Sequence, residues 1–246
     1  HSFPTRRSSD LSGYNAVDGY QLSRRVDYRY TYKLADYFGT GVDIRYAFSR
    51  KAWNGMAYIE RNWDENRQFL QFAGGSTVEQ INSTEPISAT VNLFYALFLS
   101  QNYLKLYQKD FIKANYAVQL NSKWNVNSTL EYRSRSSLEN HEENGFFYKE
   151  RRFESNGNPF TTSKQVFGSI LVRYQPFATW RRYNGARRLS NESGPTLIGM
   201  YDQAFGDNIF SKVSFQLFQT IPLANWGSIN YRISAAHFIN KPSLIL

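Results

Sequence analysis

The sequence contains no cysteine, and this absence removes several classes of protein at once. Disulfide scaffolds, thiol catalysis, iron–sulfur clusters and cysteine zinc sites all need that residue. Long apolar runs are also missing. The longest, Val91–Leu99, is interrupted by Asn92 and falls far short of the roughly 20 residues that a membrane-spanning helix requires. The low mean hydropathy of −0.55 does not exclude a transmembrane β-barrel, because only alternate residues of its strands are apolar.

Histidine is nearly as scarce, with only His1, His141 and His237 in the chain. A histidine metal site or a Ser–His–Asp triad therefore lacks its parts. No two carboxylates stand at a spacing that marks an acid–base pair. The GTG motif at Gly39–Gly41 lacks the third glycine of a dinucleotide site, and we expect it in a hairpin turn. We expect no catalytic residue, no cofactor and no metal, so we do not expect an enzyme.

Alternation of apolar and polar residues is what the sequence has in abundance. From Tyr20 to Lys33 the apolar or aromatic residues take every second position, and Arg24 is the exception. A period of two indicates a strand, and this one is longer than the five or six residues usual in globular proteins. The pattern recurs, more weakly in the last four segments, at Val42–Ser49, Ile112–Asn121, Trp124–Arg133, Lys212–Leu217, Ser228–Ala235, Ala52–Trp63, Gln68–Val78, Lys164–Gln175 and Pro195–Phe205.

Strands of this length suit a tilted crossing of a bilayer core. We therefore predict an all-β fold, an antiparallel transmembrane β-barrel of which about ten strands are visible, with one short helical segment. Short links at Asp64–Arg67 and Ala224–Gly227 alternate with long polar ones at Glu139–Thr162 and Arg181–Ser193, as expected of the two rims of such a barrel. Ser88–Ser100 loses the period of two and has helical spacing, which predicts a short helix or plug-like segment.

The two phases of the strands predict two environments. Residues expected to face a hydrated lumen are Arg25, Arg29, Asp43, Arg45, Lys113, Glu131, Arg133, Lys212 and Arg232. Residues expected to face lipid or to form interfacial girdles are Tyr28, Tyr30, Ile44, Tyr46, Tyr116, Val118, Trp124, Leu130, Phe215, Ile229, Tyr231 and Ile233.

Aromatic residues support this interpretation, with 18 Tyr, 19 Phe and 5 Trp in the chain. Tyr and Trp gather towards strand ends, which is typical of girdles at the two water–lipid interfaces. The tryptophans concerned are Trp53, Trp63, Trp124, Trp180 and Trp226. Two alternatives remain open. One is a secreted, aromatic-rich β-sandwich that binds glycans, and the other is a phospholipid-modifying barrel enzyme, which the missing Ser and His constellation disfavours.

A formal net charge of +9 raises the possibility of a nucleic-acid ligand. The basic residues are dispersed at about one per strand, often beside an acidic residue, so we expect no nucleic-acid partner. The partners we expect are outer-membrane lipids and the barrel assembly machinery during insertion. Three arginine pairs lie in loops, Arg151/Arg152, Arg181/Arg182 and Arg187/Arg188. Lipopolysaccharide is one possible partner of such loops, and the alternative that we favour is ordinary solvent-exposed loop charge. The loop Glu139–Thr162 is our candidate for an extracellular contact surface. The sequence does not define the oligomeric state.

Residues 1–11, HSFPTRRSSDL, are similar to the in-frame translation of a common sequencing adapter. They have no apolar stretch of the kind found in a secretory signal. We interpret them as an artefact of assembly and residues 12–246 as a partial barrel domain from a metagenomic or draft sequence. At the other end, single-chain outer-membrane barrels commonly finish on an aromatic residue, whereas this chain stops at Leu246, so we expect further strands beyond it.

Several phrases together resemble one family: YNAVDGYQLSRRVDYRY, GVDIRYAFSRKAWNG, EPISATVNLFYALFLSQNYLKLYQKDFIKANY, EYRSRSSLEN and DNIFSKVSFQLFQTIPLANWGSINYRISAAHFIN. They are similar to the barrel region of a large domain-of-unknown-function family of Bacteroidota. Its members typically carry a carboxypeptidase-regulatory-like β-sandwich before the barrel. The resemblance covers nearly all of residues 14–246. It implies location in the bacterial outer membrane and no peptidase zinc site, and it brings no established activity.

Overall fold

The structure is a computed structural model that describes residues 13–32, 36–63, 67–81, 88–157, 160–183, 186–191, 194–223 and 226–240. Residues 1–11, interpreted above as adapter-derived, lie outside the described residues. Residues 241–246, where we expected the chain to be cut short, lie outside them as well.

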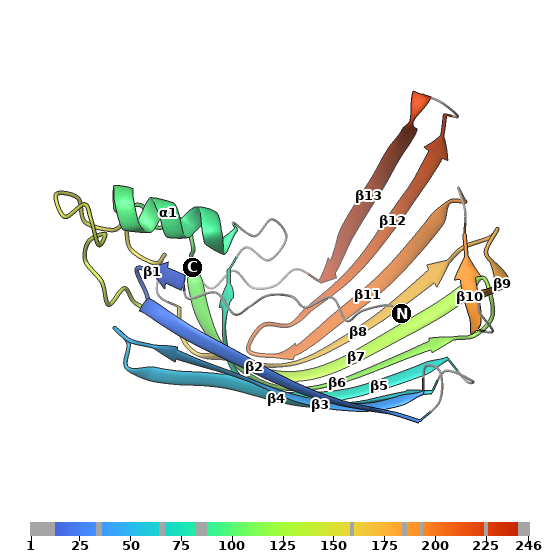
Figure 1. The fold of residues 1–246 in the computed structure, drawn as a ribbon, viewed down its shortest axis with the longest axis horizontal. Helices are drawn as coiled ribbons and strands as arrows, with labels where there is room; N and C mark the ends of the chain where they lie inside the picture. Colours follow the sequence, from blue (N-terminus) through green and yellow to red (C-terminus); the bar gives the residue numbers. More distant parts are fainter. Residues whose placement is uncertain are drawn as a thin grey trace.

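Most of the described chain forms one curved antiparallel sheet (Figure 1). Its neighbouring strands are, in order, β1 (Gly13–Asn15), β2 (Gly19–Thr31), β3 (Tyr37–Ala47), β4 (Ala52–Trp63), β5 (Gln68–Gln80), β6 (Leu106–Gln119), β7 (Trp124–Ser137), β8 (Ser163–Tyr174), β11 (Thr196–Gly206), β12 (Phe210–Pro222) and β13 (Ser228–Asn240). The ten predicted strands are β2–β8 and β11–β13, found in the predicted order. The all-β class is confirmed, whereas the sheet formed by the described strands is open and does not close into a barrel.

The predicted helix is present as α1 (Ala89–Leu99). It ends at Ser100, which adopts the left-handed conformation with a φ of 49° and donates its backbone N–H to the Tyr95 carbonyl. A residue in the left-handed conformation is a common end of a helix. Within the described part of the chain, no helix has the length and apolar character needed to cross a membrane.

One expectation about the links between strands is wrong. The segment Arg181–Ser193 belongs to a long polar link between β8 and β11, and β9 (Thr179–Tyr183) and β10 (Ala186–Ser190) pair there as a second, two-stranded sheet. The sequence between them, Asn184–Gly185, favours tight hairpins. The two predicted long links lie at opposite ends of the strands, with Arg181–Ser193 at the end of β9 and β10 and Glu139–Thr162 at the end where α1 lies (Figure 1). Long and short links are therefore not segregated between the two rims.

The GTG motif lies inside β3 and not in a hairpin turn. A Cβ atom at Gly41 would lie 2.4 Å from Asp27 Oδ1 and 2.5 Å from Tyr58 Cε1, and one at Gly39 would lie 2.9 Å from Glu60. The glycines leave room for larger side chains on the neighbouring strands. A turn residue and a space-making strand residue look alike in the sequence, so the position of these glycines could not be predicted from composition.

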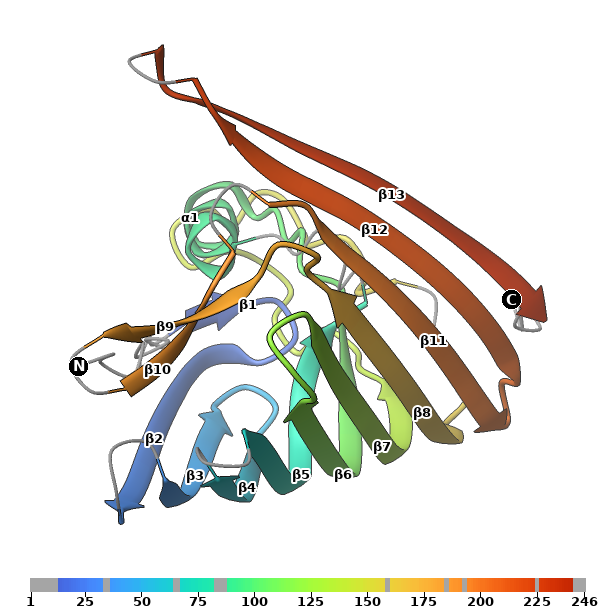
Figure 2. The same ribbon diagram turned by 90° about the vertical axis from the view of Figure 1, so that its right-hand side faces the viewer.

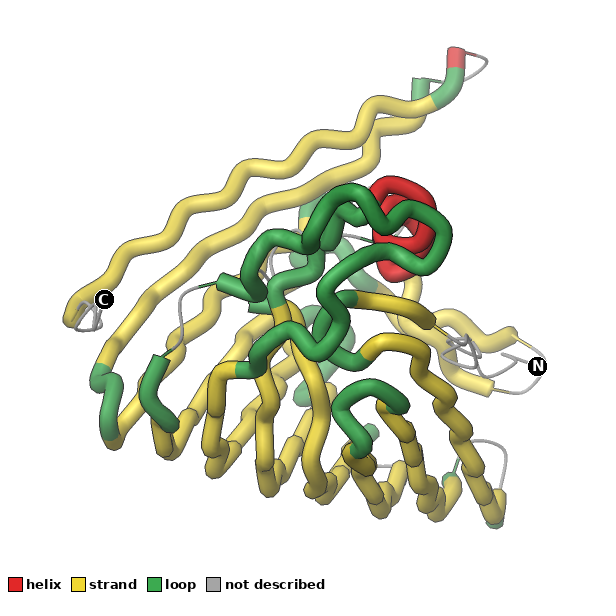
Figure 3. Tube along the Cα trace, turned by 90° about the vertical axis from the view of Figure 1, so that its left-hand side faces the viewer, coloured by secondary structure: helices red, strands yellow, loops and turns green. Residues whose placement is uncertain are grey.

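The concave side of the sheet holds a small packed unit, which we call the cap: residues 13–18, 88–105 and 138–157. Figure 3 shows its loops and helix inside the curve of the strands. Tyr14, Ala16, Ala96 and Phe153 form its buried core. The backbone N–H groups of residues 141 and 142 both donate to the Ala16 carbonyl at 3.0 Å. Much of the loop expected to be an extracellular contact surface is thus packed against β1 and α1.

Candidate functional site

The cross-strand register divides the side chains of the sheet between two faces. Directly opposed residues of antiparallel strands share a face, and successive residues alternate. All the residues predicted to face a lumen lie on one face: Arg25, Arg29, Asp43, Arg45, Lys113, Glu131, Arg133, Lys212 and Arg232. This is the concave face, because Arg45 contacts Asp18 of the cap.

The residues predicted to face lipid share the opposite, convex face: Tyr28, Tyr30, Ile44, Tyr46, Tyr116, Val118, Trp124, Leu130, Phe215, Ile229, Tyr231 and Ile233. Figure 2, turned by 90° from Figure 1, shows the curvature of the sheet. The register thus groups the residues as the alternation predicts. Contact of the concave face with water and of the convex face with lipid stays a prediction.

The convex face is mainly apolar, and exposed apolar side chains occur along the whole sheet. Val26 on β2 is 66% exposed, Ile112 on β6 is 70% exposed and Ile233 on β13 is 58% exposed. Soluble monomers rarely expose a continuous apolar surface larger than a few hundred Å². A face of this kind spanning the sheet therefore needs an apolar environment or a partner.

Polar side chains on the convex face bond to each other. The Tyr201 hydroxyl donates to Gln203 Oε1 at 2.8 Å, and the Ser211 hydroxyl donates to the same oxygen at 2.5 Å. The Tyr231 hydroxyl donates to Gln219 Oε1 at 2.7 Å. Such mutual pairing reduces the free energy cost of removing polar groups from water.

Two arginines also lie on the convex face. The Arg61 guanidinium stands 4.5 Å from the ring centre of Tyr32 and 5.6 Å from that of Trp63, close to the end of β4. Arg24, the exception in the alternation, is exposed there. A long basic side chain near a strand end can extend its charge to an interface while its stem stays on apolar surface.

The concave face carries a series of ion pairs. Lys109 Nζ lies 3.1 Å from Glu131 Oε1, and Arg133 lies 3.5 Å from the same oxygen. Further along the sheet, Lys212 Nζ lies 3.2 Å from Asp202 Oδ2. Lys109–Glu131 joins β6 to β7, and Lys212–Asp202 joins β12 to β11, so a polar surface with charges of both signs lines the hollow of the sheet.

The most buried charges join the cap to the sheet, and we call them the Asp18 cluster: Asp18, Arg45, Arg50, Asn54 and Gln108. The Asp18 side chain is fully buried, and its Oδ1 accepts from Arg50 Nε at 2.9 Å. Arg45 donates to Oδ2 of the same carboxylate. Arg50 also bonds Asn54, and its Nη1 donates to Gln108 Oε1 at 3.0 Å. One carboxylate thus holds two arginines from β3 and the link that follows it.

Of these residues, the sequence identified only Arg45. Asp18 and Arg50 lie in turns, where the period of two gives no information. The local signal that could have found Asp18 is the phrase NAVDG. The Asn15 side-chain oxygen accepts the backbone N–H groups of Val17 and Asp18 at 2.9 Å each, which fixes the turn and directs Asp18 inward.

Outside the long strands, ionisation is altered at Tyr14, which lies on the short strand β1 in the cap. Burial, and secondly the negative charge of Glu142, raise the pKa of the Tyr14 phenol from 10.0 to about 12. Its hydroxyl donates to the Asn144 carbonyl at 3.1 Å. Within the described residues, no group of three or more His, Cys, Asp or Glu side chains is placed to hold a metal ion.

A family model matches residues 4–246, and its description is the C-terminal domain of a family of unknown function, DUF5686. No curated protein and no solved structure matches the chain.

Proposed function

We propose that this chain forms part of the wall of an outer-membrane β-barrel in Bacteroidota. The premise is that the chain belongs to the family of unknown function DUF5686, as its C-terminal domain. The observation that carries the proposal is the exposed apolar convex face. Bilayer-spanning strands require about 9–11 residues. The long strands of the main sheet have 11 to 14 residues.

The energetics favour lipid over water on this face. Each Å² of apolar surface removed from water contributes about 25 cal/mol. Side chains such as Val26, Leu130 and Ile233 are each more than half exposed. A bilayer core would cover them without a second protein layer. The glycan-binding β-sandwich gains no support, because the described strands do not form two packed sheets around these side chains.

The proposal includes a hydrated interior lined by the paired charges of the concave face. Transport, display at the cell surface and envelope biogenesis are the roles compatible with such a wall, and its charges would tune selectivity if it conducts. We propose no enzymatic activity. The partners we propose are membrane lipids, lipopolysaccharide at exposed basic loops, the assembly machinery, and a carboxypeptidase-regulatory-like domain preceding the barrel.

Single cysteines test which face meets lipid, because the chain has none of its own. Leu130→Cys and Thr129→Cys lie on adjacent residues of β7 with opposite facing. Ile233→Cys and Arg232→Cys form a second matched pair on β13. The full-length protein in isolated outer membranes is treated with a water-soluble maleimide. We expect the Thr129 and Arg232 variants to react and the Leu130 and Ile233 variants to be protected until the membrane is dissolved and the protein unfolded.

Equal labelling of both members of each pair in intact membranes would contradict the proposal. Heat-modifiable migration on a gel provides an independent check, because a closed barrel resists SDS until it is boiled and a β-sandwich generally does not. Every variant should show this shift, which also verifies that it folds.

A further inference from the structure

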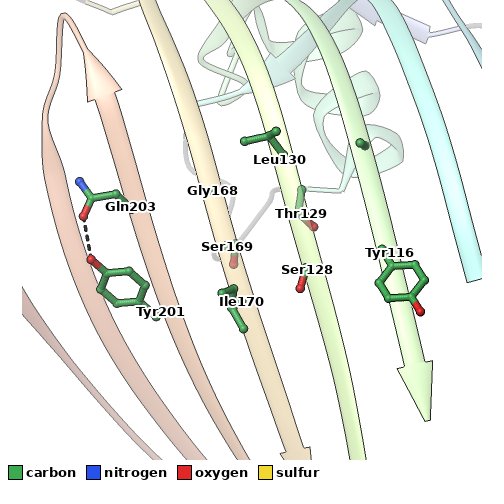
Figure 4. A pocket seen from close by; sticks show the side chains of 10 residues that line it. Tyr116, Ser128, Thr129, Leu130, Gly168, Ser169, Ile170, Tyr201 and Gln203 are labelled. Carbon is green, nitrogen blue, oxygen red and sulfur yellow. Dashed lines mark hydrogen bonds between the residues drawn. The ribbon is translucent and has the colours of Figure 1, made fainter. Parts of the chain in front are cut away.

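The convex face has a depression of about 420 Å³ across β6, β7, β8 and β11 (Figure 4). Two neighbouring cross-strand rows form it. One row is Tyr116, Ser128, Ile170 and Tyr201, and the other is Ala114, Leu130, Gly168 and Gln203. Small residues stand among large ones in both rows, so the surface is hollowed where side chains are short.

Gly168 is one of the small residues that line the hollow. A Cβ atom built there would meet no other heavy atom within 4 Å, so the glycine leaves open space towards the convex side. Leu130 precedes it in the row and Gln203 follows it. Tyr116 and Tyr201, on strands separated by β7 and β8, stand at the two sides of the depression (Figure 4). The result is an apolar recess between two aromatic rings.

The polar atoms at one side of this recess already have partners. The oxygen of the Gln203 amide accepts from Tyr201 and Ser211, and its nitrogen donates to the Ala204 carbonyl at 3.1 Å. A polar ligand would therefore have to replace existing bonds. What the recess offers is dispersion contact and removal of apolar surface from water, and an alkyl chain gains most from these.

We propose that the recess is a binding site for one acyl chain of a membrane lipid, held longer than the lipids around it. The inference rests on the proposed function, because the recess is continuous with the apolar face assigned there to lipid. A chain lying in the hollow would contact Leu130 and Ile170 along its length, with Tyr116 and Tyr201 beside it.

The chain offers a matched pair of substitutions to test the site. Gly168→Leu fills the recess. Gly199→Leu places the same side chain on the convex face of β11, outside the recess. Gly199 is a matched position, because a Cβ atom there would also meet nothing within 4 Å. Ala114→Leu, on β6 within the recess, is a second filling variant in case Gly168→Leu fails to fold. Heat-modifiable migration verifies folding of each.

The probe is phosphatidylethanolamine with a spin label on its acyl chain, in vesicles of phosphatidylethanolamine and phosphatidylglycerol that contain the full-length protein. Electron paramagnetic resonance measures the motionally restricted fraction. We expect saturable binding that Gly168→Leu and Ala114→Leu weaken by about tenfold, because the added leucine side chain would occupy the space that the acyl chain fills. Gly199→Leu should leave it unchanged.

The inference is overturned if all variants retain the same restricted fraction as the original protein. It is also overturned if the filling variants alter only the oligomeric state, since a second copy of the chain would then occupy the recess. Protection of Ile233→Cys from the water-soluble maleimide, measured in the same vesicles, keeps the two proposals separate. Protection with no saturable lipid binding refutes the lipid site alone, whereas loss of protection refutes the membrane wall.

Discussion

Replacing Asp18 by Asn should destabilise the protein more than removing a charge from one of its exposed ion pairs. The substitution keeps the shape of the side chain but leaves Arg45 and Arg50 without their shared carboxylate. The Arg50 side chain is only 8% exposed and Asp18 is fully buried. Breaking a buried pair by removing one partner costs about 3–5 kcal/mol, because an uncompensated charge stays buried. We expect a loss of this size in the free energy of unfolding.

The measurement is urea unfolding of the full-length protein in lipid vesicles, followed by tryptophan fluorescence, with protease sensitivity of the cap as a second signal. Asp27→Asn is the control, because the Asp27–Arg25 pair, at 2.9 Å, has side chains 48% and 35% exposed. Exposed pairs contribute about 1 kcal/mol or less. If Asp18→Asn costs no more than Asp27→Asn, the Asp18 cluster does not hold the cap. Combining Asp18→Asn with Arg50→Gln should recover part of the loss.

Three further predictions concern the cap and the sheet. Asn92→Ala should lower the free energy of unfolding in urea by about 1–3 kcal/mol. The reason is that the fully buried Asn92 side chain accepts the backbone N–H groups of Tyr103 and Leu104 at 2.8 and 3.2 Å. A smaller loss would mean that these N–H groups find other partners. Gly206→Ala should lower the free energy of unfolding by about 1–3 kcal/mol. Gly206 has a φ of +116°, and a Cβ atom there would lie 2.4 Å from a backbone oxygen. Gly199→Ala is the control and should leave the stability nearly unchanged. Tyr14 should contribute stability that is intact below pH 10 and declines as the pH rises towards 12, because its folded pKa is raised and the unfolded chain releases the proton first. The measurement is the urea midpoint of unfolding as a function of pH, and Tyr14→Phe should reduce the decline of this midpoint between pH 10 and 12. If Tyr14→Phe leaves the decline unchanged, Tyr14 is not its source.

The strands could be predicted because their signal is local. Each alternation records which side chains share a face, and this requires no knowledge of neighbouring strands. The ends of the strands were less predictable. β3 begins at Tyr37 and β6 at Leu106, both earlier than the alternation suggests. Cross-strand hydrogen bonding extends a strand through residues such as Gly39 and Lys109, whose side chains do not report a strand on their own.

In the candidate site, too, the features with a local signal were predictable and the features that join distant residues were not. The two sets of residues predicted for opposite faces lie on opposite faces because a period of two fixes relative orientation along each strand. The Asp18 cluster was missed because its members are far apart in the sequence. Arg50 and Gln108, for example, are separated by 58 positions and meet only after β3, β6 and the cap have assembled.

The sequence by itself determined the all-β class, the order of the long strands, the short helix and the two-sided character of the sheet, because all of these depend on contacts or periodicities within a few residues. Only the tertiary structure decided where the cap docks, which charges are buried against it, and that Ala114, Ser128 and Gly168 combine into one recess. These features join separate strands, and their register is set by the whole sheet.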